Sequence, residues 1–109
     1  MASLQWNLIK PKKAIPGRCR HTMNLIGTKQ ALVIGGYGTQ DQPPLKGVHI
    51  LHLDDMSWSS FEIGSLFPLT RAGHSTVMMN ENTAIVFGGY DVNNNLLNET
   101  FLFDVRCLK

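Results

Sequence analysis

The sequence predicts an all-β protein in which one four-stranded antiparallel unit occurs twice. The seven residues at 31–37 (ALVIGGY) recur at 84–90 (AIVFGGY), an offset of 53 residues. Each copy is followed by a turn-rich stretch and then by a second apolar run, at 48–53 and 100–105. Because no segment has the apolar spacing of an amphipathic helix, strands are the expected regular structure.

Each unit contains short runs of β-branched and aromatic residues that are separated by turn residues. The first and second runs are continuously apolar, which is typical of strands buried on both faces. The strands are expected at 21–26, 31–34, 48–53 and 58–63 in the first unit, and at 74–79, 84–87 and 100–105 in the second.

The fourth strand has its only other counterpart at residues 6–9, ahead of the first unit. Trp6 matches Trp58 at an offset of 52 residues. We therefore expect residues 5–10 to be the outer strand of a neighbouring unit. The two units themselves are expected at about 18–63 and 71–109.

Three motifs recur at consistent spacing: the paired glycines, a preceding Arg-x-x-His and a following Trp. Together they resemble the kelch repeat, which forms one four-stranded blade of a β-propeller and has a period near 50 residues. The match covers about residues 6–105. One position departs from the pattern, because the aromatic residue usual in the third strand is Phe101 in one copy and His49 in the other.

The resemblance gives the repeated residues structural roles. Paired glycines allow positive φ angles and close backbone approach, and tryptophans fill the space between blades. The repeated histidines are expected near the central channel. The residues expected to be structural are Gly35, Gly36, Gly88, Gly89, Trp6, Trp58, His21 and His74.

Composition and spacing argue against several functions. The formal net charge of +2 is too small to indicate a nucleic-acid partner, and no run approaches the apolar length of a membrane helix. Two cysteines form neither a disulfide framework nor a zinc site, which favours a reducing, cytoplasmic location. His74 and Ser75 are adjacent in a strand and point to opposite faces, so they cannot act as a catalytic pair. We expect no catalytic residue, metal or cofactor.

The function expected from the resemblance is a protein-interaction scaffold that binds a protein or peptide through loops on one face. These loops differ between the copies while the framework repeats, which fits recognition by loops. For the two repeated arginines and the two repeated histidines, hydrogen bonding between blades is the favoured role, and contact with a ligand is the alternative. The partner-binding candidates are Arg18, Tyr37, Asp41, Arg71, Tyr90 and Asp91.

Two other interpretations remain open. The chain could be a building block that closes a propeller ring head-to-tail from two-blade copies, with three copies favoured. It could also be a piece of a longer propeller, including, less favourably, a kelch-like enzyme.

Overall fold

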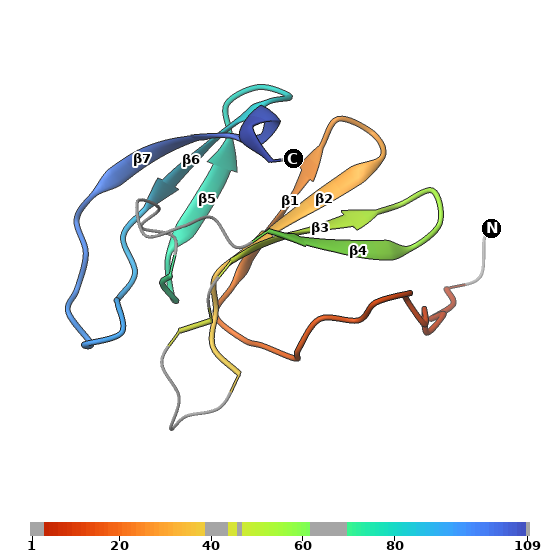
Figure 1. The fold of residues 1–109 in the computed structure, drawn as a ribbon, viewed down its shortest axis with the longest axis horizontal. Coiled ribbons are helices and arrows are strands. Elements are labelled where there is room, and N and C mark those ends of the chain that lie inside the picture. The colour runs from red at the N-terminus through yellow and green to blue at the C-terminus, as the bar shows by residue number, and fades with distance from the viewer. Residues whose placement is uncertain (1–3, 39–43, 46, 62–69, 109) are drawn as a thin grey trace.

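The computed structural model describes residues 4–38, 44–45, 47–61 and 70–108, and within them it consists of two antiparallel sheets (Figure 1). The first sheet has four strands in the order β1-β2-β3-β4, and the second has three in the order β5-β6-β7. Each strand therefore pairs with its neighbour in sequence. The all-β prediction and the two-blade architecture are confirmed, and we call the sheets blade 1 and blade 2.

The strands begin and end within two residues of the predicted positions. A three-residue 3₁₀ turn, Val105–Cys107, follows the last strand. The bounds are β1 (Thr22–Ile26), β2 (Gln30–Ile34), β3 (Val48–His52), β4 (Ser57–Phe61), β5 (Ser75–Met78), β6 (Thr83–Phe87) and β7 (Thr100–Asp104). The predicted end of the fourth strand, at 62–63, lies outside the described residues.

The hydrophobic core lies between the two blades. Directly paired residues in neighbouring strands share a face, so Ile34 and Val48 from blade 1 point the same way as each other. They join one buried cluster with Val86 and Phe103 from blade 2. Each blade thus contributes one apolar face to a shared core, as expected for packed sheets.

Burial on both faces was predicted for the first two strands of each unit. This is correct for β2, in which 31–34 are buried, but wrong for β6, in which Phe87 is 49% exposed. It is also wrong for β1 and β5, in which half-buried and exposed residues alternate along most of the strand. β1 and β5 are edge strands of their sheets, and they contact each other. One face of each contacts the other blade, and the other face meets solvent.

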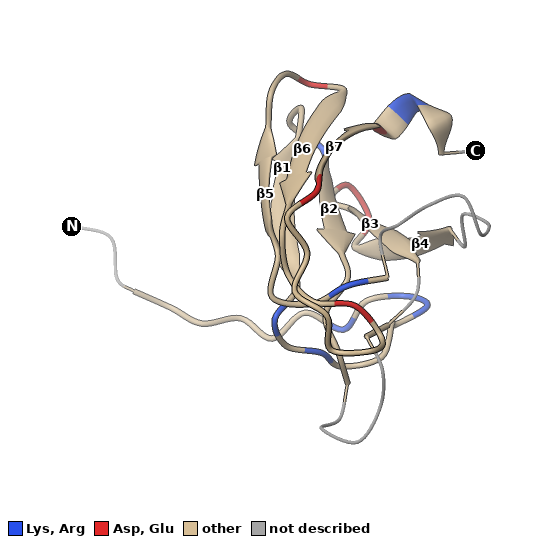
Figure 2. Cartoon of the chain, turned by 90° about the vertical axis from the view of Figure 1, so that its left-hand side faces the viewer, with Lys and Arg blue, Asp and Glu red and all other residues tan. Residues whose placement is uncertain are grey.

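Strands β1 and β5 lie side by side and join the blades (Figure 2). Thr22 Oγ1 lies 2.9 Å from Nε2 of His74 and 2.8 Å from Oγ1 of Thr76. Asn24 donates from Nδ2 to the backbone oxygen of Thr76. Thr22, Asn24, His74 and Thr76 therefore connect the two blades, while buried Nδ1 of His74 has no hydrogen-bond partner among the described residues.

The N-terminal segment does not form a strand in the described chain. Trp6 is 100% exposed, and residues 4–11 have no β-sheet partner. Only Lys12 pairs, in a parallel bridge to Ser57 at the edge of blade 1. The role of 5–10 as the outer strand of a neighbouring blade stays a prediction.

Candidate binding face at the loop end

The loops that follow β2 and β6 meet the segments leading into β1 and β5 at one end of the molecule (Figure 1). Cys19 and Tyr37 exchange two backbone hydrogen bonds, each 2.9 Å long. Ala72 and Tyr90 exchange the matching pair, 3.2 and 2.9 Å long. The repeat therefore fixes both tyrosines of the Gly-Gly-Tyr motif in the same way.

The two tyrosines come together although they are 53 residues apart in sequence. The ring centroids of Tyr37 and Tyr90 are 6.5 Å apart, with the planes tilted by 50°. The guanidinium of Arg20 lies 5.9 Å above the Tyr37 ring, within the range of a cation–π contact. We call Arg20, Tyr37, Tyr90 and the adjacent Asp91 the loop-end cluster.

The ionisation of this cluster favours polar recognition. A hydrogen bond with the Cys19 side chain, followed by the charge interaction with it, raises the pKa of Tyr37. The phenol is protonated at neutral pH, as an ordinary tyrosine is. Asp91 Oδ1 accepts from the backbone N–H groups of Asn95 and Asn93, at 3.0 and 2.9 Å. These bonds lower the pKa of Asp91, which therefore carries a negative charge and shapes its own loop.

Arg18 and Arg71 hold the same position in the two blades and make the same main contact. Nη1 of Arg18 donates to the carbonyl oxygen of Gly35 at 3.0 Å, and Nη1 of Arg71 donates to that of Gly88 at 2.8 Å. Arg18 is half-buried, whereas Arg71 is only 1% exposed. Each arginine side chain thus bonds the end of the second strand of its own blade. A role of either arginine in partner contact stays a prediction.

The departure from the kelch pattern in the third strand lies beside these arginines. In blade 2 the Arg71 guanidinium lies 5.3 Å from the Phe101 ring centroid. In blade 1 Arg18 Nη2 lies 3.3 Å from Nε2 of His49, and His49 Nδ1 lies 2.8 Å from Ser60 Oγ. Burial, with the Arg18 charge, lowers the pKa of His49 and favours a neutral ring that accepts from Arg18. A hydrogen bond replaces the stacking contact.

Three of the four paired glycines lie where another backbone segment approaches closely. Gly35 and Gly36 have φ of 68° and 95°. A Cβ atom on Gly35 would overlap the Arg71 carbonyl oxygen, and one on Gly36 would lie 2.8 Å from the Cys19 oxygen. In blade 2, a Cβ on Gly89 would lie 2.6 Å from the Ala72 oxygen, whereas one on Gly88 would meet nothing closer than 3.6 Å.

The two repeated histidines have different surroundings. His74 is buried between the blades, and this burial, followed by the nearby charge of Arg71, lowers its pKa to about 4. His21 is exposed. Asp41, the remaining partner-binding candidate, lies outside the described residues.

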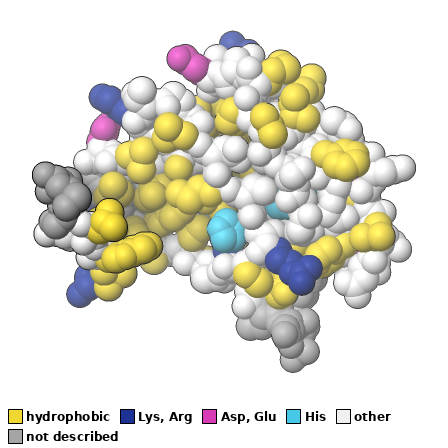
Figure 3. Space-filling view, turned by 180° about the vertical axis from the view of Figure 1, so that it is seen from behind, with side chains coloured by type: hydrophobic (Ala, Val, Ile, Leu, Met, Phe, Trp, Pro, Cys, Tyr) yellow, Lys and Arg dark blue, Asp and Glu magenta, His cyan; other side chains and the backbone are white. Residues whose placement is uncertain are grey.

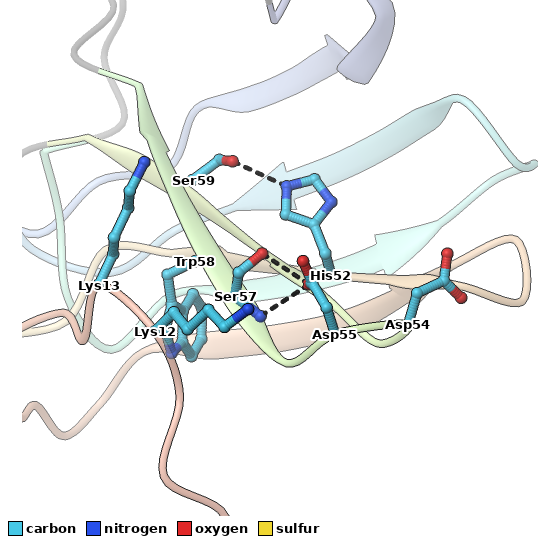
Figure 4. Close-up of a pocket in the computed structure, with 8 residues that line it drawn as sticks. All are labelled: Lys12, Lys13, His52, Asp54, Asp55, Ser57, Trp58 and Ser59. Carbon is cyan, nitrogen blue, oxygen red and sulfur yellow. Dashed lines mark hydrogen bonds between the residues drawn. The ribbon is translucent and has the colours of Figure 1, made fainter.

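Sequence reasoning missed one member of the loop-end cluster and one pocket. Arg20 carries no repeat signature, because its counterpart is Gly73. It has a positive φ of 57°, and its guanidinium lies over the Tyr37 ring. The pocket has a volume of about 510 Å³ beside β4, and half-buried Trp58, expected between blades, forms part of its wall (Figure 4). Because lysine and aspartate side chains both line the pocket, its charge favours neither an anionic nor a cationic ligand. Its lining is Lys12, Lys13, His52, Asp54, Asp55, Ser57, Trp58 and Ser59.

In the part of the chain that the structure describes, no three His, Cys, Asp or Glu side chains lie together as metal ligands would. The same residues include no helix with the length and hydropathy needed to cross a membrane.

Comparison with known proteins agrees with the fold. The family model described as the KLHDC2/KLHL20/DRC7 Kelch-repeats domain matches residues 20–109. The chain is 32% identical to Adagio-like protein 3 of Oryza sativa subsp. japonica, over 95% of the chain and 16% of that protein. It is 31% identical to Adagio protein 3 of Arabidopsis thaliana, over 96% and 17% respectively.

A further relative is the Acyl-CoA-binding domain-containing protein 4 of Arabidopsis thaliana, 27% identical over 80% of the chain and 13% of that protein. The chain thus spans about a sixth or less of the length of these relatives. Two blades with matching glycine, arginine and tyrosine contacts agree with the family match. The chain belongs to the kelch-repeat family.

Proposed function

We propose that this chain is a protein-interaction module that binds a peptide or protein loop at its loop-end cluster. The observation that carries the proposal is the meeting of Tyr37, Tyr90 and Arg20 from both blades at one surface. Tyrosine and arginine are enriched where proteins bind each other, because both combine apolar area with hydrogen-bond donors. No catalytic group is needed for this role.

The charge of the loop end favours an acidic segment as the partner. Lysine and arginine residues gather along the loops at this end (Figure 2). Arg20 is exposed, and its guanidinium lies over the Tyr37 ring. The contact restricts the side chain, while its N–H groups stay accessible to a partner. A carboxylate on the partner would accept from them with a charge-assisted bond.

We place this interaction in a reducing, cytoplasmic compartment. Cys19 and Cys107 are both exposed and unpaired. An oxidising compartment would favour their pairing with other thiols. Cys19 also lies beside Tyr37 in the cluster, where oxidation of the thiol would alter its hydrogen bond with the phenol.

The test is selection of binders from a random displayed peptide library, followed by affinity measurement with the selected peptides. We expect peptides rich in Asp and Glu, and at least a tenfold loss of affinity in Arg20→Ala and in Tyr90→Ala. Lys29→Ala, at the opposite turn between β1 and β2, is the matched control and should bind as the parent does. Peptides that ignore the first two changes but lose affinity with Lys29→Ala would place binding on the other end and refute the proposal.

A further inference from the structure

The core between the blades shows which face of a kelch blade in this chain contacts the next blade. Blade 1 presents Leu32, Ile34 and Ile50 to blade 2, and they are 1%, 0% and 6% exposed. We call this the downstream face of blade 1. The opposite side of a blade, which contacts the preceding one, is its upstream face.

Blade 2 carries an equivalent downstream face in the open. Phe87 is the counterpart of Ile34, and Leu102 is the counterpart of Ile50. They are 49% and 66% exposed, and Val77, paired in register with Ile85 and through it with Leu102, is exposed beside them. The repeat has kept apolar residues at positions that blade 1 buries, so this face is built for burial.

A comparison of Gly35 with its counterpart Gly88 also shows open space beside blade 2. In blade 1, a Cβ on Gly35 would overlap the Arg71 oxygen and lie 2.7 Å from His74 Cε1, because the segment entering blade 2 fills that space. Gly88 is the counterpart of Gly35 and has a similar φ, 77° against 68°. Its Cβ would meet nothing within 3.6 Å. Gly88 therefore leaves room for a segment equivalent to 71–74 of another blade.

Residues 18–21 of this same chain have the sequence that would fill the room. They are the counterparts of 71–74, and they precede β1, whose side chains on the upstream face are exposed: Met23 and Leu25 are 51% and 58% exposed. Further into this face, Ala31 and Val33 of β2 are already buried, so the exposed part is the β1 edge. Apolar side chains gather widely on the surface seen from behind, with few charges among them (Figure 3).

We propose that the downstream face of blade 2 binds the upstream face of blade 1 of a second copy of this chain. Ser75, the counterpart of Thr22, then takes the place of Thr22 opposite a histidine, and exposed His21 of the other copy takes the place of His74. The new contact repeats the geometry of the contact already made between β1 and β5.

A second copy is the occupant because this chain supplies both halves of the contact. The polar pair, the space at Gly88 and both apolar faces all come from one sequence. Binding one copy to the next covers the open downstream face of the first and the exposed β1 edge of the upstream face of the second. Such a contact is head-to-tail, so it continues until rotation closes a ring.

The experiment measures molar mass by light scattering during size-exclusion chromatography of the full 109-residue chain. We expect a single species whose mass is a whole-number multiple of the chain mass. Leu102→Glu and Leu25→Glu should each give a folded monomer with an unchanged far-ultraviolet spectrum, since both side chains are exposed in one chain. Leu96→Glu is the matched control: Leu96 is also exposed and apolar but lies in the loop before β7, and its mass should equal that of the parent.

A mixture of the two monomeric variants decides the geometry. Leu25→Glu retains its downstream face and Leu102→Glu retains its upstream face, so together they form one intact contact and should give a species of twice the chain mass. A monomeric parent chain overturns the proposal and leaves the face to another kelch repeat. An oligomer that survives Leu102→Glu, aggregation without a defined mass, or a mixture that stays monomeric also overturns it.

Discussion

The Thr22 hydroxyl lies 2.9 Å from Nε2 of His74 and so connects the innermost strands of the two blades. Thr76 Oγ1 lies 2.8 Å from the same hydroxyl, which makes Thr22 the centre of a small polar network beside the apolar core. Buried networks of this kind couple their members, because the loss of one group leaves another unpaired.

Removing Thr22 from this network should loosen the contact between blades. We expect Thr22→Val to lower the free energy of unfolding by about 1–2 kcal/mol, and Thr76→Val to lower it by less, since Thr76 makes one of the two bonds. In the double variant the effects should not add, because both changes remove the same bond. Chemical denaturation of the four proteins measures this, and full additivity would contradict the network.

The stability of the protein should fall in mild acid because of His74. Burial lowers its folded-state pKa to about 4, below the ordinary value of 6.5, so the unfolded state binds more protons between these limits. The stabilisation is fully present above pH 6.5 and is lost as the pH falls towards 4, by up to about 3 kcal/mol. His49, whose pKa is also lowered, acts in the same direction.

Thermal unfolding between pH 7.5 and 4.5 tests the assignment to His74. In His74→Gln, which keeps a group able to bond Thr22, the slope of melting temperature against pH should be much smaller than in the parent. An equal slope in both proteins would assign the effect to other groups.

The glycines should be structural to different degrees. Val in place of Gly36 or Gly89 should cost more than about 2 kcal/mol, because the left-handed backbone and the close carbonyl are both violated. Ala at Gly35 should cost clearly more than Ala at Gly88 in the Leu102→Glu background. The two have similar positive φ, so the difference isolates the overlap with Arg71. Equal melting temperatures for the Gly35 and Gly88 variants would contradict the contact.

The paired arginines should contribute unequally to stability. Arg71 is buried, and its Nη2 lies 3.6 Å from Glu99 in addition to the bond that Nη1 makes to Gly88. Arg71→Ala should therefore lower the free energy of unfolding by about 2–3 kcal/mol, more than Arg18→Ala, which removes a half-buried side chain. Denaturation of the two variants side by side is the measurement, and a larger loss at Arg18 would reverse the ranking.

The N-terminal segment should matter for assembly and not for the single chain. Trp6 is fully exposed, so deletion of residues 1–10 should leave the melting temperature of the monomeric Leu102→Glu variant unchanged. In the parent chain the same deletion should abolish the oligomer, since 5–10 are expected to be the missing outer strand beside β7 of another copy. An oligomer of unaltered mass after deletion would remove this segment from the interface.

Much of the fold could be predicted because its signals are local and repeated. Apolar runs bounded by turn residues place β2 and β6 closely, and the Gly-Gly-Tyr motif indicates their ends. Burial was harder to predict. β1 (TMNLI) and β5 (STVM) carry more polar residues than β2 and β6, and one face of each is open. Phe87 of β6 is as apolar as its counterpart Ile34 and yet is 49% exposed, because exposure also depends on what packs against a sheet.

The candidate site was predictable only in part. Tyr37 and Tyr90 stand out because the repeat carries them, but their contact depends on how two linking segments turn. Arg20 joins them through a left-handed backbone that no residue pattern around it indicates. Gly35 and Gly88 are the same residue in the same motif, and only three-dimensional structure shows that one space is filled and the other is open.

The simple strand order has a consequence for how the chain acquires its structure. Every pair of strands joins neighbours in sequence, so each hairpin closes a short stretch of chain at a low cost in conformational entropy. Contacts of this kind form early and rapidly. The sheet of blade 1 is complete at Phe61, and the residues that cover its core come later, from 75 onwards. A ribosome-bound chain therefore has all the strands of blade 1 available for pairing before the sheet that covers its core has been made.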